Sequence, residues 1–567
     1  MRRKSVGILL GLLVSAGAVS ISAPPAGAAE TATALDLVAT VNYERAAHGL
    51  DALLVEPVLM ADAADRVHRQ ASAQSLGHTT QMPESDGPWM SWGENVGRGP
   101  SVAAIHQAFM NSPAHAGNIF NSGYTSLAVG IEWGGDGRVY VTELFVGRPQ
   151  GYRPTRLFVG GAATEAITAL SPAWYFAEGA TWPGHEEYLL VVNPGTEQAT
   201  VDVATFSPSG PLDHHSLVVP GGSRATLHVN DVTPPGDVSL ALQSDRPVAA
   251  MRSVFLSDGW TNDGAVAPGI AAPSQTWYLP EANTGAGFRT YLALFNPAAV
   301  AATTHVTYLT SKGPVDGGDI SVPPASRTTV PLHLVMPNAE LSLQLASDQP
   351  VVAERTEVFD FQGTRGMQNA AGYVAPSPAL HFAEGYTGNG FQEYLLVQNP
   401  DPRPTTARVS LLTSGNPVTI NVDLPGQGRA TVDVNAAVGA NREVGATVEA
   451  PSGIVAERVE YFHTVDTEGG TAAAGFSPSA WSILPEGYLG PGFRTYVLLS
   501  NPGDADASVQ LTYLTEGGAF ARAPLSVPGH SRVTVDTGND VGGSFGVQVQ
   551  SDRPVVAEEA EYFAFGL

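Results

Sequence analysis

Four residues in the first quarter of the chain have side chains that suit acid–base or metal chemistry. They are His78, Glu94, His115 and Glu143, and Ser112 precedes His115 by three positions. Two imidazoles and a carboxylate that meet in the fold can form a zinc site with an open position, or orient a water by hydrogen bonds. The alternative is a buried polar network in which Glu94 accepts backbone N–H bonds from its own loop. We favour the network over a metal or catalytic role, because polar clusters mark functional sites only probabilistically.

The stretch "MNSPAHAGNI" predicts a short helix that carries the second histidine. Ser112 is a good N-cap, and Pro113 then takes the first helical position, where its missing N–H costs nothing. His115 lies in the positive field of this helix start, which disfavours the imidazolium and predicts a neutral ring near pH 7. The capping role would occupy the Ser112 hydroxyl. We therefore do not expect Ser112 to be a nucleophile, and no residue is assigned as catalytic.

Helices and strands alternate around these residues from about position 33 to 149. Apolar spacing predicts a helix that contains Leu37 and Arg45 and stops at Gly49, and further helices over 58–74 and 102–110. Strands are predicted over 126–133 and 139–145, joined by the glycine-rich turn 134–137. The stretch 78–100, which contains "WGENVG", is predicted to be a loop. This region is therefore a mixed α and β domain.

The order of motifs in this region resembles the CAP superfamily. The motifs are "VNYERAAHGLDAL", "GHTT", "WGENVG", "FMNSPAHAGNI" and "VYVTELFVG". This group, also called the SCP domain, holds cysteine-rich secretory proteins, insect venom antigen 5 and plant pathogenesis-related proteins. The similarity is to its cysteine-free bacterial branch and covers Thr33 to Arg148, about a fifth of the chain.

The resemblance implies an α-β-α sandwich with a central cleft lined by two histidines and acidic residues. His78 and His115 match the family's two histidines, and Glu94 matches the glutamate of its Gly-Glu-Asn motif. Ser112 stands where eukaryotic members have a second glutamate, and Glu143 where bacterial members often have glutamine. Some members bind Zn²⁺ or another divalent cation through the histidines, which makes His78 and His115 the candidate metal ligands. The family as a whole has no agreed enzymatic activity.

The N-terminus predicts export. Residues 1–28 combine a basic start, an apolar run and a small-residue cleavage site, which is the pattern of a secretory signal peptide. No later segment is long and apolar enough to span a bilayer. The chain contains no sorting motif or hydrophobic tail after its last repeat. We therefore expect a secreted, extracellular protein, either released or retained non-covalently at the cell surface.

Charge and cysteine content exclude several classes of protein. The formal net charge is −26, and removal of the three cations of the signal peptide leaves it near −29. Such a charge opposes binding to nucleic acid or anionic lipid. The sequence has no cysteine, which excludes disulfide scaffolds and thiolate metal sites.

Four copies of one unit follow residue 149. Each begins with a phrase such as "WYFAEGATWPGHEEYLLVVNP" and repeats the same residues at the same offsets. The recurring glutamates are Glu178, Glu281, Glu384 and Glu486, spaced by 103, 103 and 102 residues. The recurring tyrosines are Tyr188, Tyr291, Tyr394 and Tyr496, the asparagines of the Asn-Pro pairs are Asn193, Asn296, Asn399 and Asn501, and the arginines are Arg224, Arg327, Arg429 and Arg532.

Unit length and turn spacing predict seven-stranded, immunoglobulin-like β-sandwiches. The expected repeats are 174–256, 277–360, 381–463 and 481–563, after a linker over 150–173 whose apolar run at Leu157 and Phe158 would pair with the first repeat. We expect structural roles for the recurring residues: Asn-Pro ends a strand, and Glu pairs with Arg within each sandwich. A fourfold ligand site is the alternative. The "GF" or "GH" loop before each recurring tyrosine is the expected recognition edge.

The sequence thus leaves three functions to compare. The first is a secreted, monomeric, non-enzymatic protein that binds a lipid, a peptide or a cell-envelope component in the His/Glu cleft, with the repeats as a spacer or adhesive stalk and no required cofactor. The second is an extracellular metal-dependent hydrolase, held near its polymer by the repeats. The third is a surface adhesin that acts mainly through the repeats.

Overall fold

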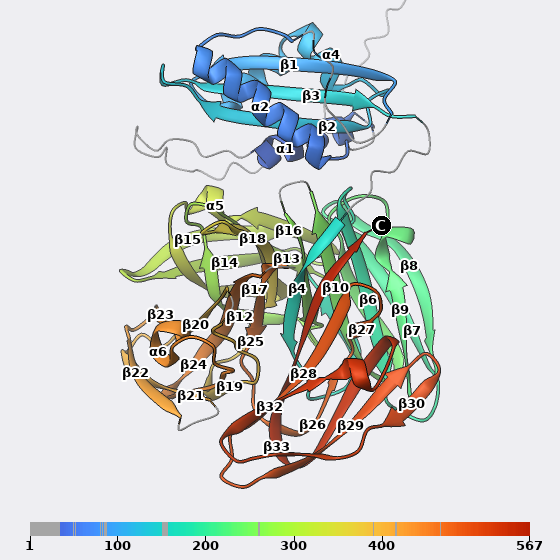
Figure 1. Cartoon of the computed structure of the whole chain (residues 1–567), viewed down its shortest axis with the longest axis vertical. Helices are drawn as coiled ribbons and strands as arrows, with labels where there is room; N and C mark the ends of the chain where they lie inside the picture. Colours follow the sequence, from blue (N-terminus) through green and yellow to red (C-terminus); the bar gives the residue numbers. More distant parts are fainter. Residues whose placement is uncertain are drawn as a thin grey trace, which may run out of the picture.

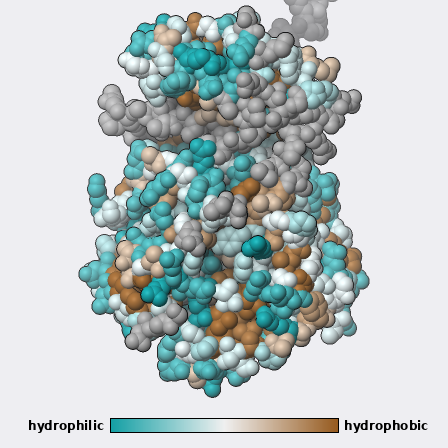
Figure 2. Space-filling model, viewed as in Figure 1, coloured by the Kyte–Doolittle hydropathy of each residue, from teal (hydrophilic) through white to brown (hydrophobic). Residues whose placement is uncertain are grey.

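The computed structural model describes residues 34–48, 50, 53–79, 81, 83, 88–149, 157–258, 261–388, 390–413, 417–464 and 467–566. The expected signal peptide therefore lies outside the described residues. Within them, none of the helices has the length and apolar character needed to cross a membrane. An N-terminal α/β domain lies above a larger β region (Figure 1), and the face shown in Figure 2 is mostly hydrophilic over the first and carries hydrophobic patches over the second.

The N-terminal domain is a three-stranded antiparallel sheet with helices on both faces. Its elements are α1 (Ala34–Ala47), α2 (Pro57–Ala73), β1 (Ser91–Gly99), α3 (Val102–Met110), α4 (Pro113–Ile119), β2 (Ser126–Trp133) and β3 (Val139–Gly147), with sheet order β1-β3-β2. Along β3, Leu144 and Val146 pack on α2, whereas Val141 and Phe145 pack on the side of α1 and α3. This alternation, which follows from the two-residue period of a strand, buries both faces of the sheet.

The expected loop over 78–100 is partly wrong. Its second half forms β1, which pairs with β3 from Ser91↔Gly147 to Gly99↔Val139. Three glycines and an asparagine give this segment low β-propensity, but the pairing and the burial against α2 and α3 override that preference. Gly97 is needed here, because a Cβ would overlap Ile105 of α3.

The β region consists of four units, each crossed by one very long strand. Unit 1 contains β5 (Ser171–Phe176), β6 (His185–Asn193), β7 (Ala199–Ser207), β8 (Gly210–Val219), β9 (Ser223–His228), η1 (Val229–Asp231), β10 (Ser239–Ser257) and β11 (Asn262–Pro268). Unit 2 contains β12 (Ser274–Asn283), β13 (Phe288–Asn296), β14 (Ala302–Thr310), β15 (Gly313–Val322), β16 (Ser326–Pro331), α5 (Leu332–Val335), β17 (Glu340–Phe361) and β18 (Thr364–Ala371).

Units 3 and 4 repeat the pattern. Unit 3 contains β19 (Ser377–Phe382), β20 (Phe391–Asn399), β21 (Thr405–Leu412), β22 (Val418–Leu424), β23 (Gly428–Asp433), α6 (Val434–Val438), β24 (Gly445–His463) and β25 (Glu468–Ala474). Unit 4 contains β26 (Ser479–Leu484), β27 (Tyr488–Leu489), β28 (Phe493–Asn501), β29 (Ala507–Thr515), β30 (Gly518–Ala521), β31 (Leu525–Val527), β32 (Ser531–Asp536), η2 (Thr537–Asn539) and β33 (Gly543–Gly566).

The long strand joins two half-sheets in each unit. The first part of β10 pairs with β5 and β7, and its second part pairs with β6 and β11. The register shifts between Gln243 and Val248, at the "SDRPV" phrase, where Pro247 cannot donate to the ladder. The units are thus curled antiparallel sheets, and an immunoglobulin-like identity is not established by this topology.

A strand from before unit 1 completes unit 4. β4 (Leu157–Glu165) pairs with β33 along its whole length, from Leu157↔Gly566 to Glu165↔Glu558. It occupies the place that β11, β18 and β25 take beside the long strands of the other units. The predicted pairing of Leu157 and Phe158 with the first repeat is therefore wrong, because these residues lie on a strand of the fourth sheet. The four units close into a ring (Figure 1) instead of extending in a row as a stalk.

One carboxylate lies where the four completing strands meet. Asp263 of β11 is fully buried and accepts backbone N–H bonds from Gly161 of β4 (3.1 Å), Met367 of β18 (2.8 Å) and Gly470 of β25 (3.1 Å). A Cβ at Gly160 of β4 would overlap its Oδ1 atom. One side chain thus links all four units at the centre of the ring.

The recurring Glu and Arg pair between units, not within them as predicted. Arg327 of unit 2 contacts Glu178 of unit 1 at 2.7 Å, and Arg429 of unit 3 contacts Glu281 of unit 2 at 2.8 Å. Arg224 of unit 1 donates to the carbonyl oxygens of Gly487 (3.1 Å) and Phe545 (2.7 Å) of unit 4, and Arg532 of unit 4 donates likewise to unit 3. Each of the four junctions between neighbouring units therefore contains one recurring arginine.

The recurring asparagines have the structural role that was predicted. The Asn193 side chain donates to the carbonyl oxygens of Glu197 and Val219 and accepts from the Gly195 N–H. Asn296, Asn399 and Asn501 make the same set of bonds in the other units. Each Asn-Pro pair thus fixes the corner that follows its strand.

Substitution of Gly160 tests the closure of the ring. Gly160→Ala should place a methyl group against the Asp263 carboxylate and lower the stability of the β region by about 2 kcal/mol or more, measured by thermal unfolding. Gly236→Ala is the matched control, because a Cβ there has no neighbour within 4 Å. Equal melting temperatures for the two variants would contradict the closure by β4.

Candidate functional site

The candidate residues of the N-terminal domain gather around its edge strand β1. His78 Nδ1 lies 3.0 Å from Glu94 Oε2, and the Thr79 N–H donates to the same oxygen at 3.1 Å. Arg66 of α2 contacts the other oxygen, Oε1, at 3.3 Å. The Glu94 side chain is 3% exposed and that of His78 is 61% exposed, so a buried acid holds an imidazole at the surface.

Arg66 holds the buried Glu94 in place. Its guanidinium also contacts Asp62 of α2 at 2.9 Å and the Gln81 carbonyl oxygen at 3.1 Å. A buried carboxylate with donors on both oxygens matches the network interpretation of Glu94. The donors differ from the prediction, since among the described residues of this loop only Thr79 contributes a backbone N–H.

His115 approaches from the other side of β1, on α4. Burial lowers the pKa of His115, and the nearby His78 lowers it further. This direction agrees with the predicted neutral ring, but the causes are burial and His78 and not the field of the helix start. Its ring packs against Phe109 of α3 at 4.9 Å between ring centres. A neutral His115 keeps one nitrogen lone pair that can accept a hydrogen bond.

Ser112 does not cap this helix with its side chain. It stands at the N-cap position with extended φ and ψ, and Pro113 occupies the first turn, but its hydroxyl makes no capping bond. The prediction that capping occupies this hydroxyl is therefore wrong. The N-cap position was predicted correctly from the sequence, while the capping hydrogen bond of the side chain was not.

Glu143 lies on the opposite face of the sheet from Glu94. Asn95 and Glu143 are cross-strand partners, and Asn95 Nδ2 donates to Glu143 Oε2 at 2.8 Å and to the His115 carbonyl oxygen at 3.2 Å. Asn118 of α4 in turn donates to Asn95 Oδ1 at 2.8 Å. The two asparagines, to which the sequence interpretation assigned no role, connect Glu143 to the backbone of His115.

Burial makes Glu143 a weaker acid than an exposed glutamate. The side chain is fully buried, and this raises its pKa to about 7, against the opposing effect of the Asn95 hydrogen bond. Its Oε1 atom has no hydrogen-bond partner among the described residues. Glu143 thus titrates near neutral pH as part of the support behind His115.

The residues described do not bring three or more His, Asp or Glu side chains into an arrangement that could hold a metal ion. His78 and His115 would be the ligands of any cation here, with Glu94 already bound on both oxygens. This donor set is too small for the three protein ligands of a typical catalytic zinc site.

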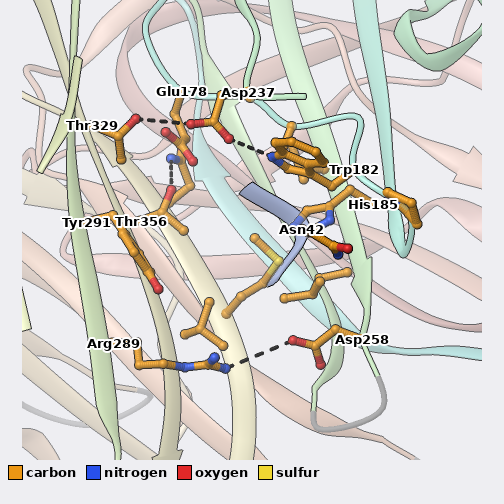
Figure 3. Close-up of a pocket in the computed structure, with 18 of the residues that line it drawn as sticks. Asn42, Glu178, Trp182, His185, Asp237, Asp258, Arg289, Tyr291, Thr329 and Thr356 are labelled. Atoms are coloured by element: carbon orange, nitrogen blue, oxygen red, sulfur yellow. Dashed lines mark hydrogen bonds and ion pairs between the residues drawn. The ribbon is translucent and has the colours of Figure 1, made fainter. Parts of the chain in front are cut away.

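A separate cavity of about 680 Å³ lies where the N-terminal domain meets units 1 and 2 (Figure 3). Apolar side chains of the ring, including Leu256, Val358 and Met367, form much of its wall. Trp182 donates to Asp237 at one end, and Arg289 faces Asp258 at 4.0 Å at the other. The sequence did not predict this cavity, since it forms only when distant segments pack together.

Two family models match the chain. A model of the cysteine-rich secretory protein family (CAP) matches residues 38–146, and a model of a family of unknown function (DUF5719) matches residues 160–363 and 350–560. The N-terminal domain is thus a CAP domain without cysteines, as its motifs predicted, followed by a β-rich region. No curated protein matches the chain.

Three solved structures are each similar to a part of this chain. An outer surface protein from Borrelia burgdorferi is 17% identical, over 20% of this chain and 90% of its own, with a TM-score of 0.19. A cysteine-rich secretory protein from Staphylococcus aureus is 19% identical, over 20% of this chain and 38% of its own, with a TM-score of 0.16. The Anabaena sensory rhodopsin transducer is 24% identical, over 15% of this chain and 97% of its own, with a TM-score of 0.14.

The raised pKa of Glu143 predicts a pH-dependent stability. Its carboxyl holds a proton up to about pH 7 in the folded chain but only to about pH 4.3 when unfolded, so the folded state loses stability as the pH rises through this range. Between pH 5 and pH 8 the wild type should lose roughly 2 kcal/mol that Glu143→Gln retains. Denaturant unfolding at both pH values measures this, and parallel losses in the two proteins would refute a neutral buried Glu143.

Proposed function

We propose a binding function for this chain, which belongs to the family of unknown function DUF5719 and carries a CAP domain at its N-terminus. In this proposal the protein is secreted, and His78 and His115 recognise a small ligand at the edge of β1. A lipid, a peptide or another cell-envelope component is the ligand class, as the sequence suggested. The ring of repeats is a rigid platform that carries the CAP domain.

The engagement of Glu94 is the observation that carries the proposal. Arg66, His78 and Thr79 together place donors on both carboxylate oxygens, and the side chain is almost fully buried. A carboxylate in this state orients a neighbouring group and is poorly placed to take a proton from a substrate. Its role is to hold the exposed His78 in one orientation.

His115 supplies the second contact. Its lowered pKa favours the neutral imidazole, which accepts one hydrogen bond and donates another. Asn95 and Asn118 fix the helix that carries it. Two positioned imidazoles on either side of one strand suit the recognition of hydroxyl, amide or carboxyl groups.

The ring fits a platform better than the stalk inferred from the sequence. Its closure through β4 and the arginines that link successive units favour one rigid body. The classification of each unit as an immunoglobulin-like sandwich belongs to the same proposal. Its support is the pair of half-sheets that enclose an apolar core in units 2 and 3.

The competing function is a metal-dependent hydrolase in which His78 and His115 hold Zn²⁺ or another divalent cation. It requires at least one further ligand beside the two imidazoles. Calorimetry with Zn²⁺ separates the two functions. Uptake of one ion per chain, lost in His78→Ala and accompanied by turnover of an ester, peptide or glycan substrate, would replace binding by hydrolysis.

Co-sedimentation with cell-wall and membrane fractions of a bacterium tests the binding function. The full mature chain should sediment with one of these fractions, and His78→Ala and His115→Ala should each weaken this by about tenfold, the equivalent of one lost hydrogen bond.

His68→Ala is the matched control, because His68 is an exposed histidine of α2 that pairs with an acid, Glu132, at 3.0 Å. Equal sedimentation of all three variants would refute a role of the β1 edge. The third function, adhesion through the repeats, predicts that outcome.

A further inference from the structure

The four units of the ring meet at four seams, and each seam contains one recurring tyrosine. We number a seam by the two units that form it. Tyr291 lies at seam 1–2, where it lines the cavity of Figure 3. Tyr394 lies at seam 2–3, Tyr496 at seam 3–4 and Tyr188 at seam 4–1. Equivalent places in the four seams can thus be compared directly.

Aromatic side chains from both units fill two of the seams. At seam 2–3, Phe288 and Phe359 of unit 2 pack with Tyr461 of unit 3. At seam 4–1, Phe255 of unit 1 packs with Phe563 and Phe565 of unit 4. These seams are closed by the protein's own rings.

Seam 3–4 is hollow instead. A groove of about 1120 Å³ lies between units 3 and 4. Six aromatic side chains line it: the buried Phe563 and the half-buried Tyr386, Phe391, Phe493, Tyr496 and Tyr562. Edge-to-face contacts hold the rings, with centres 5.2 Å apart for Tyr386–Phe391 and 6.3 Å apart for both Phe391–Tyr562 and Tyr496–Tyr562. The groove therefore has a preformed aromatic lining, and the "GF" loops expected as recognition edges supply Phe391 and Phe493.

A positively charged side chain also lines this groove. Arg494 is exposed, lines the groove, and makes no ion pair with any described residue. Its counterpart at seam 1–2, Arg289, faces Asp258, whereas Thr464 takes the place of that aspartate at seam 3–4. His463, at the same groove, is paired with Glu468 at 3.0 Å. The guanidinium of Arg494 thus offers its donors to a ligand.

We propose that the groove at seam 3–4 binds the pyranose rings of a neutral glycan. The electron-rich faces of aromatic side chains attract the C–H-rich faces of sugars, and half-buried tyrosines present both a ring and a hydroxyl. The five N–H donors of Arg494 suit sugar hydroxyl groups. The strong negative charge of the whole chain opposes a polyanionic polymer.

This site is separate from the CAP cleft, since none of the described residues of the CAP domain lines the groove. Glycan binding is therefore expected to persist in His78→Ala and His115→Ala. Failure of the glycan site and failure of the proposed cleft are distinguishable, because each has its own probe and its own variants.

Calorimetric titration of the full mature chain with chitohexaose, cellohexaose and mannohexaose tests the proposal. We expect saturable binding of at least one of these neutral hexasaccharides, and a weakening of about tenfold or more in Tyr496→Ala, with most of the affinity kept in Tyr496→Phe. Tyr291→Ala, at the same repeat position but at seam 1–2, is the matched control and should bind as the wild type does. Arg494→Ala, an exposed change, gives a second test should Tyr496→Ala fail to fold, and it should also weaken binding.

Three outcomes would overturn the proposal. Absence of binding to all three hexasaccharides would refute a neutral glycan site. Tighter binding of hexagalacturonate would assign the groove to an acidic ligand through Arg494. Binding of a proline-rich decapeptide without binding of any sugar would assign the aromatic lining to peptide recognition.

Discussion

The buried carboxylate of Asp263 is the interaction on which the ring depends. It lies where strands of all four units meet, and it accepts N–H bonds from the three strands that surround it. Burial raises its pKa well above the usual range, although these bonds oppose the shift. A buried acid of this kind is costly unless every donor is in place, so the ring is stable only when β4, β18 and β25 all reach the centre. The glycines around it are required because side chains would fill the space that the carboxylate uses.

Contacts at the seams determine which units lie next to each other in the ring. Buried pairs join Arg252 to Glu354, Arg355 to Glu457 and Arg458 to Glu558, each across one junction. Such pairs contribute little net stability, but separation of the partners leaves a charge in the interior. The series does not continue from unit 4 to unit 1, where Glu559 stands in the position of the arginine. At that junction, the pairing of β4, the hydrogen bonds of Arg224 and an aromatic cluster hold the units together instead of a buried ion pair.

In the CAP domain, adjacent residues of one strand support both candidate histidines. Because successive residues of β1 point to opposite faces, Glu94 meets Arg66 of α2 while Asn95 meets Glu143 on the other side. Two adjacent residues thus support His78 from one layer and His115 from the other. The two imidazoles come together at the edge of the sheet, while the two acids remain apart, which favours positioned recognition over shared acid–base work.

The sequence by itself determined the elements and the repetition. Local patterns located α2, α3, the β2–β3 hairpin, the CAP motifs and the four-unit period, since periodicity and capping are encoded within a few residues. The tertiary structure decided what depends on distant partners. β1 forms because β3 lies beside it, and β4 belongs to unit 4 because the ring closes there. The recurring glutamates and arginines meet across seams, and equivalent seams are filled or hollow according to which side chains face each other. Contacts between segments hundreds of residues apart leave no local pattern, and therefore only the packed chain could show them.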